Sequence, residues 1–193
     1  MRTIVRMTTA PATRRYDPAR RDRIIDACLD VIAEVGVDGT SHRRVAEAAD
    51  VPLGSMTYHF SGRRELLHEA FTRFSLTVSD QLDARMASVT TVEEAKVAVL
   101  QTITGDLFAD PRDLVLTHEL YTLAARDDSF RDITNGWMAR SRHVLEQHFD
   151  PVTARILDAL VEGLSIHRAL DIEPHDDAVA RTAIDRITAG AAS

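Results

Sequence analysis

The stretch from Thr40 to Leu67, TSHRRVAEAADVPLGSMTYHFSGRRELL, constrains the fold of this chain more than any other part of it. A hydroxyl at Thr40 or Ser41 can cap a first short helix, and small apolar residues follow at helical spacing. Asp50 then stands where the chain must reverse, because aspartate tolerates a left-handed backbone better than most residues. Pro52 can open a second helix, since its missing amide would be unpaired there anyway. Two short helices around a tight turn form a helix-turn-helix, which predicts DNA binding.

The second helix of this motif, Leu53–His59, makes barely two turns and exposes groups that suit close approach to a duplex groove. The exposed residues are Leu53, the small Gly54, the hydroxyl-bearing Ser55, Thr57 and Tyr58, and the imidazole of His59. A helix this short needs tertiary support, and Phe60 and Leu66 are expected to anchor it in a core.

The order and spacing of the motif residues match a known bacterial pattern. The matching positions are Ser41, Val45-Ala46, Ala49-Asp50-Val51, Tyr58-His59-Phe60, Arg63 and Leu66-Leu67. On these residues the chain resembles the Tet repressor (TetR) family of bacterial transcriptional regulators. The resemblance is one of sequence motif over residues 17–67, and beyond them it is one of helical architecture only. Two residues depart from the family pattern: Asp50 replaces the usual glycine, and Thr57 stands where a phosphate-binding tyrosine is common. Tyr58 follows one place later, so we expect rearranged phosphate contacts.

The expected DNA contacts fall into three groups. Arg43 matches a position from which family members reach a base edge, and its forked guanidinium suits guanine O6 and N7, with a phosphate contact or a solvated charge as the alternatives. The groove-facing residues are expected to be Leu53, Gly54, Ser55 and Thr57. Hydroxyl, imidazole and guanidinium donors are assigned to phosphates, namely Ser41, His42, Tyr58, His59 and Arg63. For Tyr58, a place in the core is the alternative.

The formal net charge of −7 is unusual for a DNA-binding protein until it is divided along the chain. Residues 1–64 hold 11 arginines against 8 acids, a balance of +3, whereas residues 65–193 carry −10. A basic end on an acidic body would orient the protein on a polyanion, although an ordinary solvated surface can show the same asymmetry.

The rest of the chain has helical periodicity with few breaks. A helix is predicted to begin at Asp17-Pro18 and to end at Gly36, and amphipathic segments are predicted at 63–88, 92–108, 111–126, 129–149, 151–170 and 176–189. Strand-like alternation is missing, so the predicted fold is all-α with about nine helices. We expect a flexible arm at 1–16, a helix-turn-helix head at 17–64, and a ligand-binding and dimerisation body at 65–193.

Composition favours a cytoplasmic protein without membrane contact. No stretch approaches the roughly 20 apolar residues of a membrane span, and the N-terminal segment lacks the continuous apolar core of a signal peptide. The single cysteine, Cys28, lies on the apolar stripe of the first predicted helix, so core packing is favoured over metal or redox chemistry.

The body is larger than DNA binding requires, and its central helices place polar groups among aromatic ones. An apolar cavity with a few polar anchors is what a small-molecule site needs. The expected lining, inferred chiefly from the resemblance, is Phe74, Phe108, Leu116, His118, Tyr121, Trp137 and Met138. Plain core packing is the alternative for each aromatic residue, and the identity of the effector cannot be read from the sequence.

One short reading helix per head offers too little contact for high specificity, so a homodimer on a palindromic operator is expected. The last two long helices are the expected interface, as the resemblance also implies. Their apolar ridge consists of Ile156, Leu157, Leu160, Val161 and Leu164, with Ala159 and Gly163 allowing close crossing. Packing within one chain is the alternative.

Catalytic and metal-binding patterns are weak. Ser165 and His167 are two residues apart on a helix and cannot face each other, and His143 with His148 lacks the spacing of a zinc pair. No enzyme activity, metal or cofactor is therefore expected. The leading hypothesis is a homodimeric repressor that binds double-stranded DNA and is released by a small-molecule effector. The alternatives are a sequence-indifferent DNA-coating protein and a helical ligand carrier or enzyme with a vestigial head.

Overall fold

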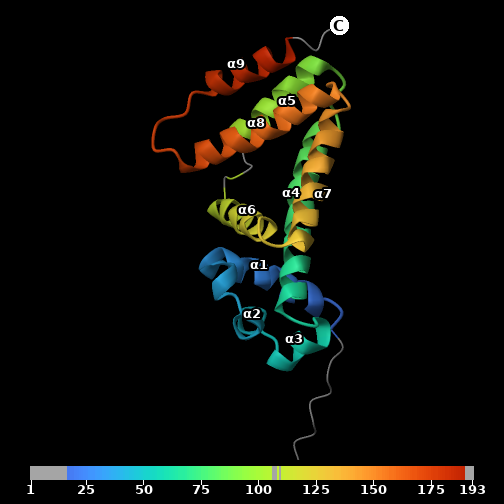
Figure 1. Cartoon of the computed structure of the whole chain (residues 1–193), viewed down its shortest axis with the longest axis vertical. Coiled ribbons are helices and arrows are strands. Elements are labelled where there is room, and N and C mark those ends of the chain that lie inside the picture. The colour runs from blue at the N-terminus through green and yellow to red at the C-terminus, as the bar shows by residue number, and fades with distance from the viewer. Residues whose placement is uncertain (1–16, 106–107, 109, 190–193) are drawn as a thin grey trace, which may run out of the picture.

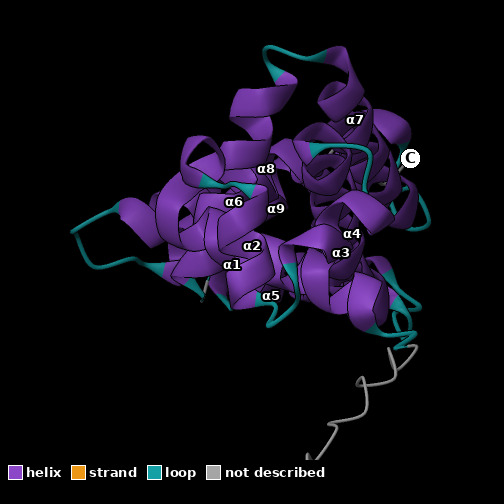
Figure 2. Cartoon of the chain, turned by 90° about the horizontal axis from the view of Figure 1, so that it is seen from below, coloured by secondary structure: helices purple, strands orange, loops and turns teal. Residues whose placement is uncertain are grey.

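The computed structural model describes residues 17–105, 108 and 110–189, and these residues form nine α-helices and no strand (Figures 1 and 2). The all-α prediction is confirmed, while the predicted arm at 1–16 lies outside the described residues. The helices are α1 (Arg20–Gly39), α2 (His42–Ala48), α3 (Leu53–His59), α4 (Arg63–Met86), α5 (Val92–Thr104), α6 (Pro111–Ala124), α7 (Asp128–Leu145), α8 (Pro151–Leu170) and α9 (Asp177–Thr188).

The turn between α2 and α3 has the geometry that its residues favour. The Ser41 hydroxyl caps α2 by accepting a hydrogen bond of 3.3 Å from the backbone N–H of Arg44. Asp50 has φ 51°, so the chain reverses through the left-handed region as predicted. The backbone N–H of Val51 donates to the Ala46 carbonyl at 2.9 Å, which closes the turn. Met56 is fully buried and anchors the short helix α3 in the core.

The end of α1 is set by a glycine. Gly36 has φ 71° and ψ 171°, a conformation that only glycine adopts readily, so the regular helix breaks at the predicted residue. One further turn carries the element to Gly39. The Thr40 hydroxyl donates to the Gly36 carbonyl at 2.8 Å, and Thr40 is buried. The break directs the chain away from α1 and into the helix-turn-helix.

The helices of the body begin at side-chain caps. Asp110, Asp127, Asp150 and Asp176 each accept backbone hydrogen bonds at the first turn of a helix. Most body helices end within two residues of the prediction, but two of them end four residues earlier. Helix α5 stops at Thr104 because the Gly105 backbone leaves the helical region, and α7 stops at Leu145, after which residues 146–149 form a turn.

Helices α4 and α7 run side by side along the length of the molecule (Figure 1). The head, with α1, α2 and α3, lies at one end of this pair, and α5, α8 and α9 lie at the other, with α6 between them. In the part of the chain that is described, no helix is both long and apolar enough to cross a membrane.

Buried side chains form two separate hydrophobic clusters. The first, which we call the head core, joins α1, α2 and α3 to α4 as far as Val78, to α6 and to the start of α7. The second, the tail core, joins the end of α4 to α5, α8, α9 and the end of α7. Phe60 and Leu66 are buried in the head core as predicted, and so is Cys28. Burial raises the pKa of the Cys28 thiol to about 12, so the thiol is held in its protonated, unreactive form.

Candidate DNA interface and ligand cavity

Helix α3 presents its expected reading face to solvent. Tyr58 is 82% exposed and Leu53 is 55% exposed, so the alternative that places Tyr58 in the core does not hold. Thr57 is exposed, and its hydroxyl donates to the Gly54 carbonyl at 3.3 Å. A side chain at Gly54 would meet no atom within 4 Å, which leaves the helix surface there open to a large partner. Ser55 and His59 are half-buried, with the His59 ring edge-on to Tyr58 at 4.8 Å.

The start of α2 and the start of α4 supply the remaining expected DNA contacts. Ser41 and Arg43 are exposed, and His42 is half-buried with no partner for its Nε2 among the described residues. Arg63 is exposed but has a structural contact as well, because its guanidinium donates to the Val37 carbonyl at the end of α1. Arg44 holds the same region by donating to the Gly39 carbonyl at 2.8 Å.

A cavity of about 60 Å³ lies in the body, between the head core and the tail core. Its lining residues come from α4, α5, α6, α7 and α8 and from the segment before α6. They are Val78, Ser79, Leu82, Thr102, Phe108, Thr117, Tyr121, Trp137, Met138, Ser141, Asp158, Val161 and Glu162. On the scale where one water needs about 10–15 Å³ and a cavity of about 150 Å³ holds benzene, this cavity has room for a few waters, and an aromatic ligand would have to widen it.

Four of the seven residues expected to line a cavity do so: Phe108, Tyr121, Trp137 and Met138. The rotation of α6 explains two of the others, because Thr117 and Tyr121, one turn apart, take the cavity side. Leu116 consequently lies fully buried in the head core, and His118 is exposed with its Nδ1 2.8 Å from the Leu114 carbonyl. Phe74 packs behind the cavity wall, edge-on to Trp137 at 5.9 Å.

Two acids in the cavity wall, Asp158 and Glu162, were missed by sequence reasoning. They lie one turn apart on α8, among apolar residues, in a pattern that also suits an ordinary solvated helix face. Burial raises the pKa of both carboxyl groups. Burial, together with the nearby charge of Glu162, also raises the pKa of Tyr121. The cavity wall therefore holds titratable groups that are partly shielded from bulk water.

The residues of the expected dimer ridge point in different directions. Leu157 is fully buried in the tail core, and Val161 is half-buried and lines the cavity. Leu160, Gly163 and Leu164 are half-buried, whereas Ile156 is 46% exposed. The outward stripe of α8 has a spacing of four, three and four and consists of Val152, Ile156, Ala159 and Gly163.

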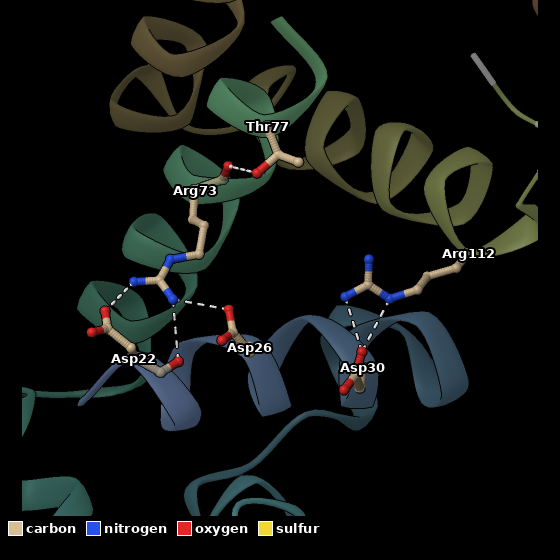
Figure 3. Close-up of polar contacts among 6 residues, drawn as sticks. All are labelled: Asp22, Asp26, Asp30, Arg73, Thr77 and Arg112. Carbon is tan, nitrogen blue, oxygen red and sulfur yellow. Dashed lines mark hydrogen bonds and ion pairs between the residues drawn. The ribbon is translucent and has the colours of Figure 1, made fainter. Parts of the chain in front are cut away.

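Polar contacts join α1 of the head to the body (Figure 3). Arg73 of α4 binds both Asp22 and Asp26, with a distance of 2.9 Å to the Asp26 carboxylate. Arg112 of α6 donates to the Asp30 carboxylate at 2.9 and 3.0 Å. These three aspartates occupy one stripe of α1 at intervals of four residues, so both body helices hold the same face of α1.

A second contact between α6 and α1 lies at the break in α1. The Glu119 carboxylate accepts a hydrogen bond of 3.2 Å from the backbone N–H of Val37. A Cβ at Gly36 would lie 2.9 Å from Glu119 Oε1, so a larger residue at position 36 would displace that carboxylate. Helix α6 therefore contacts the head through Arg112 and Glu119 and contacts the cavity through Thr117 and Tyr121.

A helix-turn-helix with an exposed reading helix, joined through shared helices to a body that holds a cavity, defines a ligand-binding transcriptional regulator. Two family models match the chain. Residues 24–70 match the model described as bacterial regulatory proteins of the tetR family, and residues 87–190 match the tetracyclin repressor-like C-terminal domain. The chain belongs to the TetR family of DNA-binding transcriptional regulators, as the resemblance of its motif indicated.

Relatives and solved structures agree with this assignment. The HTH-type transcriptional regulator PksA of Bacillus subtilis strain 168 is 26% identical over 181 residues, covering 87% of this chain and 88% of the relative. The crystal structure of regulator SCO7518 from Streptomyces coelicolor A3(2) has a TM-score of 0.84 and 53% identity, over 89% of this chain and 99% of that one. The multidrug binding protein EbrR complexed with ethidium has a TM-score of 0.74 and 32% identity, over 89% of this chain and 99% of that chain.

Proposed function

We propose that this regulator is a repressor that binds a palindromic operator as a homodimer and leaves it when a small molecule occupies the cavity. The observation that carries the proposal is the position of α6, which contacts the cavity on one face and the head on the other. The DNA contacts are those expected at the start of α2, along α3 and at the start of α4. A compact effector in the body can therefore act on a distant DNA interface through one helix.

The size of the reading helix supports a dimer. Helix α3 has seven residues, and one such helix contacts too few bases for strong discrimination. Two heads related by a twofold axis would read two half-sites that are a helical turn or a multiple of it apart. A palindromic operator follows from that symmetry.

The outward stripe of α8 is the surface that we assign to the second copy. Ile156 and Val152 are exposed there, at 46% and 68%. Gly163 continues the stripe, and a Cβ at this position would meet no atom within 4 Å. Packing within one chain therefore gives no reason for a glycine, whereas close crossing of a second α8 does.

Release by an effector is supported by the size of the cavity and by the contacts of α6. A ligand larger than about 60 Å³ must widen the cavity and displace the face of α6 that carries Tyr121. Such a displacement also moves Glu119 and Arg112, which hold α1. A ligand that prefers the widened cavity shifts the population toward the head spacing that does not fit the operator. EbrR, which has been solved in complexes with ethidium and with proflavin, supports a small-molecule effector for the body.

The DNA part of the proposal is tested by selecting bound duplexes from a random library at one stated salt concentration, because phosphate contacts make affinity salt-dependent. The expected result is one enriched palindrome. Arg43→Ala should weaken binding to it by about tenfold or more and relax the preference at one base pair. Arg126→Ala, an exposed arginine in the turn after α6, is the matched control and should bind like the unaltered protein. Recovery of no enriched sequence would favour a sequence-indifferent DNA-coating protein instead.

The dimer part is tested by placing an arginine in the α8 stripe. Gly163→Arg has room to fold within one chain and should give a monomer by sedimentation velocity, with a large loss of operator affinity. Gly136→Arg on α7 adds the same charge at an equally open position and should remain a dimer. A dimeric Gly163→Arg protein would exclude this stripe as the interface.

A further inference from the structure

We propose that the cavity selects a compact monovalent organic cation with an apolar or aromatic body, and that Glu162 is the side chain that recognises its charge. This inference rests on the proposed function, because it names the chemical class of the effector for the same cavity. It depends on three properties of the wall: the sign of its charges, its aromatic surfaces and the neighbours of its two acids.

The charged groups of the wall have one sign. Among the described residues that line the cavity, Asp158 and Glu162 carry ionisable carboxyl groups, and no arginine, lysine or histidine lies among them. The hydroxyls of Ser79, Thr102 and Ser141 add polar oxygens. A ligand anion would therefore meet like charge in a place that is partly shielded from water, which is unfavourable.

The two acids differ in their neighbours. Asp158 already has a cation, because an Arg142 nitrogen lies 3.5 Å from its carboxylate, and both side chains are about four-fifths buried. Glu162 faces the Tyr121 hydroxyl, the Asp158 carboxylate on its own helix and, on α6, the imidazole of His118. No arginine or lysine in the described part of the chain forms an ion pair with Glu162 or figures among the charges acting on it. His118 is exposed and outside the cavity lining, with its Nδ1 against the Leu114 carbonyl, so Glu162 is the carboxylate of the wall without an arginine or lysine partner.

The aromatic residues supply the rest of the recognition. The rings of Tyr121 and Trp137 lie 6.3 Å apart with an interplanar angle of 30°, and Phe108 lines the same cavity. The face of an aromatic ring carries partial negative charge and attracts an organic cation, most strongly when water is excluded. The same rings give dispersion contacts to an apolar body, so one wall serves both parts of the ligand.

A neutral ligand of the same shape keeps the dispersion contacts with the rings but loses the charge–charge attraction to Glu162. It would bury Glu162 further without offering a positive partner, and the carboxyl group would have to stay protonated or lose solvation. A cation restores a favourable partner for the ionised form. Because charge-assisted contacts contribute more than neutral ones, we expect a preference of about tenfold to a hundredfold for the cation.

The test uses two probes that differ in charge and little else. Phenyltrimethylammonium is a compact aromatic cation, and tert-butylbenzene is its neutral counterpart of nearly the same shape. Isothermal titration calorimetry of the full-length protein should show binding of the cation that is at least about tenfold tighter than binding of the neutral probe. Benzenesulfonate, an anion of similar size, should not compete.

Glu162→Gln tests the residue itself. Glutamine keeps the size and can still accept from Tyr121, so the variant should lose the preference for the cation and bind the neutral probe about as before. Glu146→Gln, at the exposed end of α7, is the matched control and should retain the preference. Equal affinities of the unaltered protein for the two probes, no detectable binding of the cation, or an unchanged preference in Glu162→Gln would each overturn the inference.

The result of the ligand test can be told apart from the result of the operator test. A protein that enriches one operator but does not prefer the cation refutes the ligand class alone. A protein that prefers the cation but binds all DNA alike refutes the operator model and leaves the cation site standing.

Discussion

Replacing Gly36 by alanine tests the contact between the head and α6 directly. The backbone there has φ 71° and ψ 171°, and a non-glycine residue held in that region costs about 1–3 kcal/mol. The new Cβ would lie 2.9 Å from Glu119 Oε1 and push the carboxylate away from the Val37 N–H. A hydrogen bond to a charged acceptor contributes about 1.5–3 kcal/mol when buried, and about 1 kcal/mol is reasonable for this half-exposed one. Gly36→Ala should therefore lower the free energy of unfolding by about 2–4 kcal/mol.

Thermal unfolding followed by circular dichroism measures this effect. For a chain of this length, each kcal/mol corresponds to a fall of about 2–4 °C in Tm, so a fall of about 5–15 °C is expected. All variants must be compared at one protein concentration, because the Tm of a dimer depends on it. Gly136→Ala is the matched control: it lies in the interior of α7 with no atom near its Cβ, so it should stabilise the protein by about 0.5–1 kcal/mol.

A double-mutant cycle separates the two parts of the effect. In a Glu119→Ala background the carboxylate is absent, so Gly36→Ala should then cost less, by roughly the 1 kcal/mol of the lost hydrogen bond. The same cost in both backgrounds would show that the approach of Glu119 to Gly36 does not contribute. A Gly36→Ala protein as stable as the unaltered one would refute the whole argument.

Three further predictions follow from single side chains. Tyr58→Ala should change the free energy of unfolding by less than about 0.5 kcal/mol, because the ring is 82% exposed, yet it should weaken operator binding measured by fluorescence anisotropy at fixed salt; normal affinity would exclude Tyr58 from the interface. Cys28, with its pKa raised to about 12 by burial, should not react with Ellman's reagent near pH 8 in the folded protein and should react fully in urea; rapid reaction of the folded protein would contradict its burial. Burial raises the pKa of Glu162 in the folded state, so the folded protein binds the extra proton at acidic pH and becomes less stable as pH rises through that pKa. Glu162→Gln should accordingly be more stable than the unaltered protein near about pH 7.5 and lose that advantage near about pH 4.5, as measured by urea unfolding; a difference that does not depend on pH would contradict the shifted pKa.

The helix-turn-helix could be predicted from the sequence because its signals are local. The Ser41 cap, the left-handed Asp50 and the proline before α3 each depend on a residue and its immediate neighbours. The same holds for the helix starts at aspartate caps. Helix ends were predicted less well, since the stop of α7 at Leu145 depends on how residues 146–149 turn toward the tail core, where Phe149 is buried.

The cavity wall could be predicted only in part, because it depends on how helices rotate against one another. Aromatic residues such as Tyr121 and Trp137 are noticeable in any sequence, and they line the cavity. Which face of α6 turns inward is decided by its packing on α1, and that packing places Leu116 in the head core. Asp158 and Glu162 look like surface charges along α8, and only the assembled fold brings them beside the rings of α6 and α7.

The division of the interior into a head core and a tail core has a consequence for the way the protein melts. The cavity lies where the two clusters meet, so without an occupant they are linked mainly by α4 and α7, the two helices that pass through both. Local unfolding follows such divisions, because each cluster can lose its packing while the other keeps it. An occupant that touches α4, α6, α7 and α8 together joins the two clusters into one cooperative unit. The effector would then complete the packing between the two clusters, and calorimetric unfolding of the protein should become more cooperative when it is bound.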